Sequence, residues 1–66
     1  MNREREEYDV FEEHPDGSTL WRDSVVGLTN ARLRAQQLST VSTNPFYVIH
    51  IPTKQMVVRV TPNLKQ

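Results

Sequence analysis

The sequence predicts an α+β domain of ββαββ order, in which two hairpins form a four-stranded sheet and one helix packs on one face. Three patterns carry this prediction. Apolar residues alternate with charged ones around a Pro-Asp-Gly turn, a leucine and alanine stripe follows at helical spacing, and two apolar runs flank a second proline turn. The 66 residues leave room for one domain, expected at 6–61, with 1–5 as a frayed segment and 62–66 as a C-terminal tail.

The first hairpin is predicted from its turn. Pro15 presets φ at the second turn position, and Gly17 accepts the left-handed conformation of a bulged hairpin. A three-residue loop pairs residues whose numbers sum to 32, which places Phe11 opposite Trp21 on one face. The other face holds Tyr8, Val10, Leu20 and Val26. The residues alone leave open which of these two faces meets the helix.

The helix is expected over residues 30–41. Thr29 is the expected N-cap, because its hydroxyl can accept hydrogen bonds from amides of the first turn. Leu28 and Leu33 have the spacing of a hydrophobic staple, although Leu33 also fits a lone exposed residue. The stripe expected to face the sheet consists of Leu28, Ala31, Ala35, Leu38 and Val41. Its two alanines predict a close approach of the helix to the sheet.

The second hairpin is expected to join residues 46–51 to residues 56–61 through a turn at 52–55. A four-residue loop pairs residues whose numbers sum to 107, and this register collects six apolar side chains on one face. They are Tyr47, Ile49, Ile51, Met56, Val58 and Val60, which we expect to form the core face. The opposite face then holds Phe46, Val48, His50, Val57, Arg59 and Thr61. It is half apolar, which is more than a solvated face requires.

Charge is balanced in total but not along the chain. All eight acidic residues lie in the first 23 positions, where three arginines reduce the sum to −5, and the remaining residues carry five cations and no acid. One interpretation is that the acidic and basic segments pack against each other. The other is a molecule with one acidic and one basic surface, which would orient a partner or a second copy.

Several classes of function are disfavoured by composition. The sequence has no cysteine, which excludes disulfides, thiol catalysis and zinc-finger sites and favours the reducing cytoplasm. The only glycines, Gly17 and Gly27, have turn roles, so there is no phosphate-binding glycine loop. No apolar run reaches the length of a membrane span, and the charged first 23 residues do not match a signal peptide. We therefore expect no enzyme and no cofactor.

Two groups of residues still invite a chemical interpretation. Glu12, Glu13, His14 and Asp16 cluster in the sequence. Successive strand residues point to opposite faces, so Glu12 and Glu13 are not expected to share a metal ion. His50 lies in an apolar strand and is expected to be a hydrogen-bonded or half-exposed strand histidine rather than a catalytic base.

Turn and packing residues carry a resemblance that covers most of residues 6–60. The stretches concerned are Tyr8-Asp9-Val10-Phe11, Pro15-Asp16-Gly17-Ser18, Leu20-Trp21-Arg22, Val26-Gly27-Leu28 and Ala31 to Leu38. They resemble small uncharacterised bacterial domains with a ββαββ layout, which often stand alone or beside signalling modules. The resemblance implies the fold, and it supplies no catalytic residues because such families have none assigned.

The function expected from the sequence is that of a non-enzymatic interaction or accessory module. Contact would be made through an apolar sheet face or a strand edge, either with a protein partner or with a second copy in a homodimer. The candidate interaction surface consists of Phe11, Trp21, Phe46, Val48, Val57 and Arg59. No membrane contact is expected.

The alternative is binding of single-stranded nucleic acid on a sheet face with aromatic rings and cations. Phe11, Trp21 and Phe46 would stack on bases, and Arg22, Arg59 and His50 would contact the backbone. Asp9 and Asp23 are expected on the same face as Trp21, and the pI near 6.7 is low for such a protein. Nucleic acid is therefore the less favoured partner.

Overall fold

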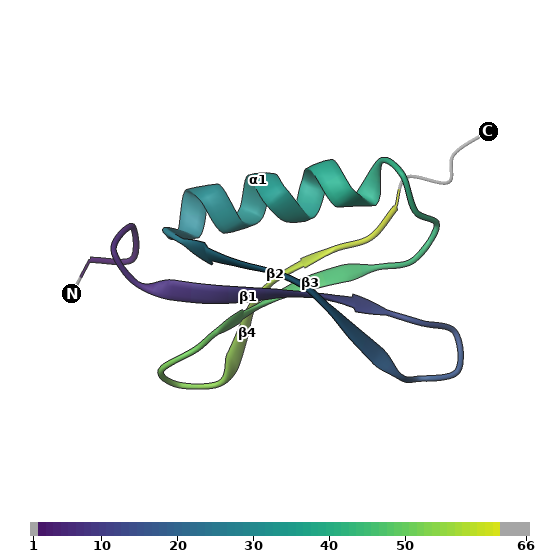
Figure 1. The fold of residues 1–66 in the computed structure, drawn as a ribbon, viewed down its shortest axis with the longest axis horizontal. Coiled ribbons are helices and arrows are strands. Elements are labelled where there is room, and N and C mark those ends of the chain that lie inside the picture. The colour runs from purple at the N-terminus through teal and green to yellow at the C-terminus, as the bar shows by residue number, and fades with distance from the viewer. Residues whose placement is uncertain (1, 63–66) are drawn as a thin grey trace.

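Within residues 2–62, which the computed structural model describes, the chain forms one sheet and one helix. The elements are β1 (Glu7–Glu13), β2 (Thr19–Val26), α1 (Leu28–Ser39), β3 (Phe46–His50) and β4 (Gln55–Val60). The strands lie in the order β2-β1-β3-β4, and every neighbouring pair is antiparallel. α1 packs on one side of the sheet (Figure 1). The predicted α+β class and ββαββ order are confirmed. The expected tail lies outside the described residues beyond Pro62.

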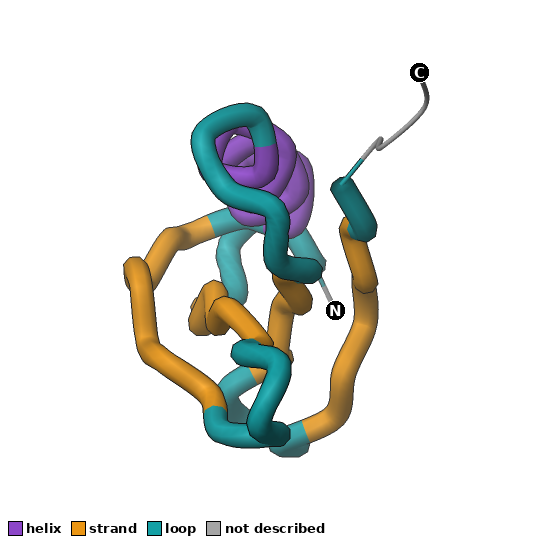
Figure 2. The backbone as a smooth tube through the Cα atoms, turned by 90° about the vertical axis from the view of Figure 1, so that its right-hand side faces the viewer, coloured by secondary structure: helices purple, strands orange, loops and turns teal. Residues whose placement is uncertain are grey.

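β1 and β3 are the central strands, and β2 and β4 form the two edges. Because β1 is antiparallel to both β2 and β3, these two strands run parallel, and α1 connects them. Viewed from the end in Figure 2, the helix lies to one side of all four strands. The sheet therefore has one face covered by α1 and one face turned away from it.

The core forms where α1 meets the central strands. The strands contribute Tyr8, Val10, Phe46 and Val48, and α1 contributes Ala31, Ala35 and Leu38. The alanines allow the helix backbone to approach the sheet closely, and the burial of each large side chain contributes roughly 1.5–3 kcal/mol. The helical stripe was predicted correctly at these three positions. Val41 is 79% exposed instead, because α1 ends at Ser39.

The start of the helix differs from the prediction. The N-cap is Gly27, with φ of 98°, and no side chain of the capping residue bonds to the first turn. The carboxylate of Glu4 takes this role, since it accepts from the Thr29 amide at 3.1 Å and from the Thr29 hydroxyl at 2.9 Å. An acidic group also complements the positive end of a helix dipole.

The N-terminal residues are consequently part of the fold. The segment 1–5 was expected to fray, but the Arg3 carbonyl accepts from the Leu28 amide at 3.0 Å and from the Tyr8 hydroxyl at 3.2 Å. Arg3 lies inside a turn that is closed by a hydrogen bond from the Arg5 amide to the Asn2 carbonyl at 3.0 Å. The segment therefore ties the start of α1 to β1.

The first hairpin has the predicted register near its turn and a shifted one beyond it. Phe11 lies opposite Trp21 as expected, and Gly17 has φ of 90°. An extra residue in β2 then moves the pairing, so that Val10 lies opposite Asp23. Asp23 therefore faces the helix, where it pairs with Arg34 at 2.9 Å. The same shift places Val25, rather than Val26, on the face of Tyr8 and Val10, where it packs against the core.

The predicted register of the second hairpin is wrong. His50 pairs with Gln55 and Phe46 pairs with Val60, so the loop is residues 51–54. Lys54 adopts the left-handed conformation, with φ of 59°, and its amide donates to the His50 carbonyl at 2.7 Å. A shift of one residue exchanges the faces of a strand. Phe46, Val48 and His50 therefore face the core, where Tyr47, Ile49 and Ile51 were expected.

Candidate functional site

The face of the sheet turned away from α1, called here the open face, carries a continuous row of side chains across all four strands. Cross-strand pairing aligns Trp21 of β2, Phe11 of β1, Tyr47 of β3 and Arg59 of β4. Residues directly opposite one another share a face, so these four form one row, which we call the aromatic row. A second row beside it consists of Ser24, Asp9, Ile49 and Met56.

The aromatic row is fixed in place and is accessible at Trp21 and Arg59, while Phe11 and Tyr47 are half-buried. The rings of Phe11 and Tyr47 stack with centroids 6.0 Å apart and planes inclined by 27°. The Trp21 indole Nε1–H donates to Asp9 Oδ1 at 3.2 Å and lies 3.3 Å from Ser24 Oγ. Trp21 is nevertheless 54% exposed and Met56 is 50% exposed. The open face therefore presents large apolar side chains whose orientation is already set.

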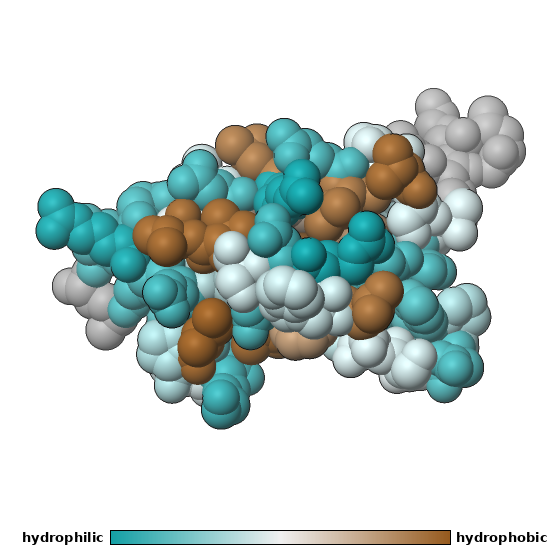
Figure 3. All heavy atoms as spheres, in the orientation of Figure 1, coloured by the Kyte–Doolittle hydropathy of each residue, from teal (hydrophilic) through white to brown (hydrophobic). Residues whose placement is uncertain are grey.

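Acidic groups accompany these apolar side chains along β1. Strand alternation places Glu7, Asp9 and Glu13 on the open face together with Phe11. Glu13 pairs with Arg59 at 3.1 Å, whereas Glu7 and Asp9 form no ion pair with a cation among residues 2–62. The open face is therefore apolar and net acidic. On the side seen in Figure 3, hydrophobic residues form separate spots among hydrophilic ones.

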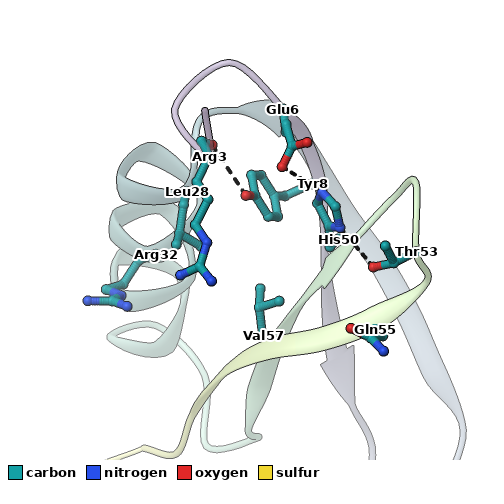
Figure 4. Close-up of a pocket in the computed structure, with 9 residues that line it drawn as sticks. All are labelled: Arg3, Glu6, Tyr8, Leu28, Arg32, His50, Thr53, Gln55 and Val57. Carbon is teal, nitrogen blue, oxygen red and sulfur yellow. Dashed lines mark hydrogen bonds and ion pairs between the residues drawn. The ribbon is translucent and has the colours of Figure 1, made fainter. Parts of the chain in front are cut away.

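The structure separates the residues of the predicted interaction surface. Phe11, Trp21 and Arg59 lie together on the open face. Phe46 and Val48 do not belong to any exposed surface, because the register of β3 turns them into the core, where both are fully buried. The sixth residue, Val57, is 45% exposed and points toward the helix side (Figure 4).

The nucleic-acid alternative loses three of its predicted contacts, because these side chains also lie on the covered side of the sheet. Phe46 is buried, and His50 is 9% exposed on the helix side. The Arg22 guanidinium donates to Glu12 on that side and lies 5.8 Å from the Phe46 ring centroid. Of the expected rings and cations, Phe11, Trp21 and Arg59 alone share the open face.

Sequence reasoning missed Tyr47, Ile49 and Met56, which the second hairpin's assumed register had placed in the core. Pairing with β1 would have supplied a signal. Tyr8 and Val10 face the core, and the β3 residues opposite them are His50 and Val48. This choice of face, which also buries Phe46, avoids burying a second phenolic hydroxyl at Tyr47, which would need a partner.

Glu12 is a buried carboxylate on the covered face, and each of its oxygens has partners. Arg22 donates to Oε1, while the Ser42 hydroxyl and the Asn44 amide each donate to Oε2 at 2.8 Å. The hydrogen bond from Asn44 is the largest cause that lowers the Glu12 pKa, and burial opposes it. The cluster attaches the loop after α1 to β1. Glu13 points to the opposite face, and no described group of three metal-ligating side chains forms a site.

His50 is the second buried polar group of the covered face. Its Nε2 lies 2.9 Å from Glu6 Oε1 and its Nδ1 lies 2.8 Å from Thr53 Oγ1. Glu6 and Thr53 thus engage the two ring nitrogens from opposite sides of the imidazole. Both nitrogens have partners, which is one of the two states expected from the sequence, although His50 lies on the covered face rather than on the face opposite the core. The neighbouring Tyr8 has a raised pKa, chiefly because its hydroxyl is buried.

Comparisons with protein-family models, curated proteins and solved structures find no match to this chain. The resemblance to bacterial ββαββ domains therefore stays a prediction. No helix within residues 2–62 is long and apolar enough to cross a membrane.

Proposed function

We propose that this protein is a non-enzymatic interaction module whose open face binds a cationic, partly apolar segment of a partner protein. The observation that carries the proposal is the aromatic row lying directly beside the acidic residues of β1. Aromatic anchors supply most of the binding energy in protein interfaces, and charges beside them select the partner. We place this contact in the cytoplasm, as the sequence favours.

A cationic partner is favoured by two contacts available at the same place. A guanidinium that stacks on Trp21 or Tyr47 gains roughly 0.5–2 kcal/mol from the cation–π interaction. The same group lies within reach of Asp9, which neighbours Trp21 in the structure. Met56 and Ile49, in the adjacent row, offer apolar area to the remainder of the segment.

Charge also separates this partner from the alternatives. Two copies joined through their open faces would bring together two acidic rows, with Arg59 already paired to Glu13 in each. Like charges without counterions weaken an interface. A nucleic acid would meet the same acidic residues, which repel phosphate. A heterologous basic segment avoids both costs.

The strand edges are the weaker docking site. β2 and β4 are the edge strands. Each contains one extra residue, a β-bulge, where its pairing with the neighbouring central strand shifts register. Such bulges twist an edge and interrupt the ladder that a partner strand would extend. The open face has no comparable obstacle.

A titration with two defined peptides tests the proposal. One peptide alternates leucine with arginine, and the other alternates leucine with glutamate at the same length. NMR follows the Trp21 indole N–H and the Met56 methyl group. The arginine peptide is expected to shift both signals, with affinity that falls as salt is raised, and the glutamate peptide is expected to shift neither.

Variants at two positions of similar exposure supply the control. Trp21→Ala should weaken binding by about tenfold, whereas Leu33→Ala on the outer face of α1 should change it by less than about twofold. Equal binding of both peptides, or an unchanged affinity in Trp21→Ala, would contradict the proposal. Tighter binding of single-stranded oligothymidylate at Trp21 would assign the face to nucleic acid. A concentration-dependent dimer that protects Trp21 would assign it to a second copy.

A further inference from the structure

A cavity of about 350 Å³ opens on the covered side of the sheet, away from the open face. It lies between the first turns of α1, the N-terminal segment and the strand ends (Figure 4). The residues around it include Arg3, Tyr8, Leu28, Arg32, His50 and Val57. Its size is at the small end of the range of ligand pockets, which is roughly 300–1,000 Å³.

The cavity exists because α1 does not close over β4. The extra residue of β4 lies between Met56, which pairs with Ile49, and Val58, which pairs with Val48. This bulge turns Val57 toward the helix side, where it faces the cavity (Figure 4). Val57 is 45% exposed there, and Leu28 provides an apolar wall on the helix. Val57 and Leu28 therefore give the otherwise polar lining an accessible apolar part.

The rim of the cavity is cationic. The Arg3 guanidinium reaches into the space between Leu28 and Val57, and Arg32 lies at the outer rim on α1 (Figure 4). Neither arginine forms an ion pair with an acid among residues 2–62. The one acid of the lining, Glu6, is held by His50 at 2.9 Å. Two cations against one engaged carboxylate leave a net positive site.

The backbone of Arg3 is held in place by hydrogen bonds. Its backbone carbonyl accepts hydrogen bonds from the buried Tyr8 hydroxyl and from the Leu28 amide, which fixes the point from which the side chain extends. No described hydrogen bond or ion pair engages its guanidinium. A guanidinium presents paired donors that match a carboxylate.

We infer that this cavity binds a small organic carboxylate with an apolar body. The carboxylate is held by Arg3, with Arg32 adding positive charge at the rim, and the apolar body lies against Leu28, Val57 and the Tyr8 ring. His50 does not bind the ligand directly, because Glu6 and Thr53 occupy both of its ring nitrogens. This site is independent of the open face and of its proposed peptide partner.

Octanoate is the probe for this inference, with 1-octanol and inorganic phosphate as the comparisons. NMR follows the Val57 methyl groups and the His50 ring, with the adjacent Met56 methyl on the open face as the internal reference. Octanoate is expected to shift Val57 and His50 and to leave Met56 unchanged. Both 1-octanol, which lacks the charge, and phosphate, which lacks the apolar body, should bind at least about tenfold more weakly.

Arg3→Gln removes the charge and keeps the backbone carbonyl that anchors the segment, so the fold is expected to persist. It should weaken octanoate binding by about tenfold, while Arg5→Gln, two residues away and outside the cavity, should change it by less than about twofold. The inference is overturned by any of four results. These are no shift at about 10 mM octanoate, shifts confined to Met56 and Trp21, equal binding of 1-octanol or phosphate, or full affinity in Arg3→Gln.

Discussion

The two faces of the sheet both carry large apolar side chains but differ in environment. On the covered face, Tyr8, Val10, Phe46 and Val48 are at most 2% exposed, because α1 packs on them. On the open face, Trp21 and Met56 are about half exposed. Apolar content alone therefore does not determine which face of a sheet becomes the core. Register decides which residues meet the helix, and the helix decides which face is buried.

The polar groups of the two faces also differ in how they are hydrogen-bonded. Glu12 and His50 are buried on the covered face, and each is fully engaged by hydrogen bonds. A buried polar group without partners would cost roughly 1–3 kcal/mol, so burial demands this arrangement. Glu7 on the open face faces no such demand and stays available for a partner.

The largest expected effect is the loss of a buried ring. Phe46→Ala should lower the free energy of unfolding by about 3–5 kcal/mol, because it removes a fully buried side chain and leaves a cavity. Tyr47→Ala, one residue along on the open face, should cost no more than about 1 kcal/mol. Urea denaturation measures both values. Similar losses at the two positions would remove the distinction between the faces.

The next largest effect concerns Glu12. Glu12→Gln keeps the shape of the side chain but removes the charge that engages Arg22, and should lower the free energy of unfolding by about 2–3 kcal/mol. Glu13→Gln, on the open face, breaks a more exposed ion pair and should cost less than about 1 kcal/mol. A larger loss for Glu13 than for Glu12 in urea denaturation would contradict the assignment.

Stability should also depend on pH through Glu12. Its pKa is lowered from the ordinary value of 4.5 in the folded protein, chiefly by the hydrogen bond from Asn44. A lowered pKa gives a contribution that is present above the unfolded value and is lost as pH falls through the folded value. Unfolding at a series of pH values between neutral and acid measures it. Asp16, whose pKa is also lowered, acts in the same direction. The part owed to Glu12 is therefore the part that disappears in Glu12→Gln, and an identical acid loss in that variant would contradict this source.

The smallest effect lies in the first turn. Gly17 has φ of 90°, and a Cβ added there would meet no atom within 4 Å, so the cost of a side chain comes from the backbone alone. Gly17→Val should lower the melting temperature, at a cost of about 1 kcal/mol or more. Gly17→Asn should cost less, because asparagine tolerates the left-handed region better. Equal melting temperatures for all three proteins would show that the turn has another conformation.

Local sequence patterns predicted the helix and the strands. The features that these patterns did not predict depend on the turn conformation at Lys54 and on contacts between residues far apart in the sequence. The helical stripe of Ala31, Ala35 and Leu38 and the pairing of Phe11 with Trp21 follow from spacing and turn chemistry. The left-handed conformation of Lys54 has no such signal, since glycine is the usual residue there. The capping of Thr29 by Glu4 joins residues 25 positions apart, beyond any local rule.

The candidate site, too, could be predicted only where local patterns determine which residues share a face. The turn of the first hairpin fixes the pairing of Phe11 with Trp21, which places both on the open face, whereas Arg59 belongs to the second hairpin and reaches that face opposite Tyr47. Phe46 and Val48 were placed on the wrong face by one residue of register in the second hairpin. The cavity beside Val57 could not be predicted, because it depends on a bulge in β4 and on the N-terminal segment folding back onto α1.

The most direct test of which face is open uses a soluble gadolinium chelate, which broadens NMR signals of protons near solvent. In dilute protein, the ring signals of Trp21 and Tyr47 are expected to broaden strongly, while those of Tyr8 and Phe46 stay sharp. A broadened Phe46 beside a protected Tyr47 would mean that the second hairpin pairs in the opposite register, and the proposed docking face would then belong to the core.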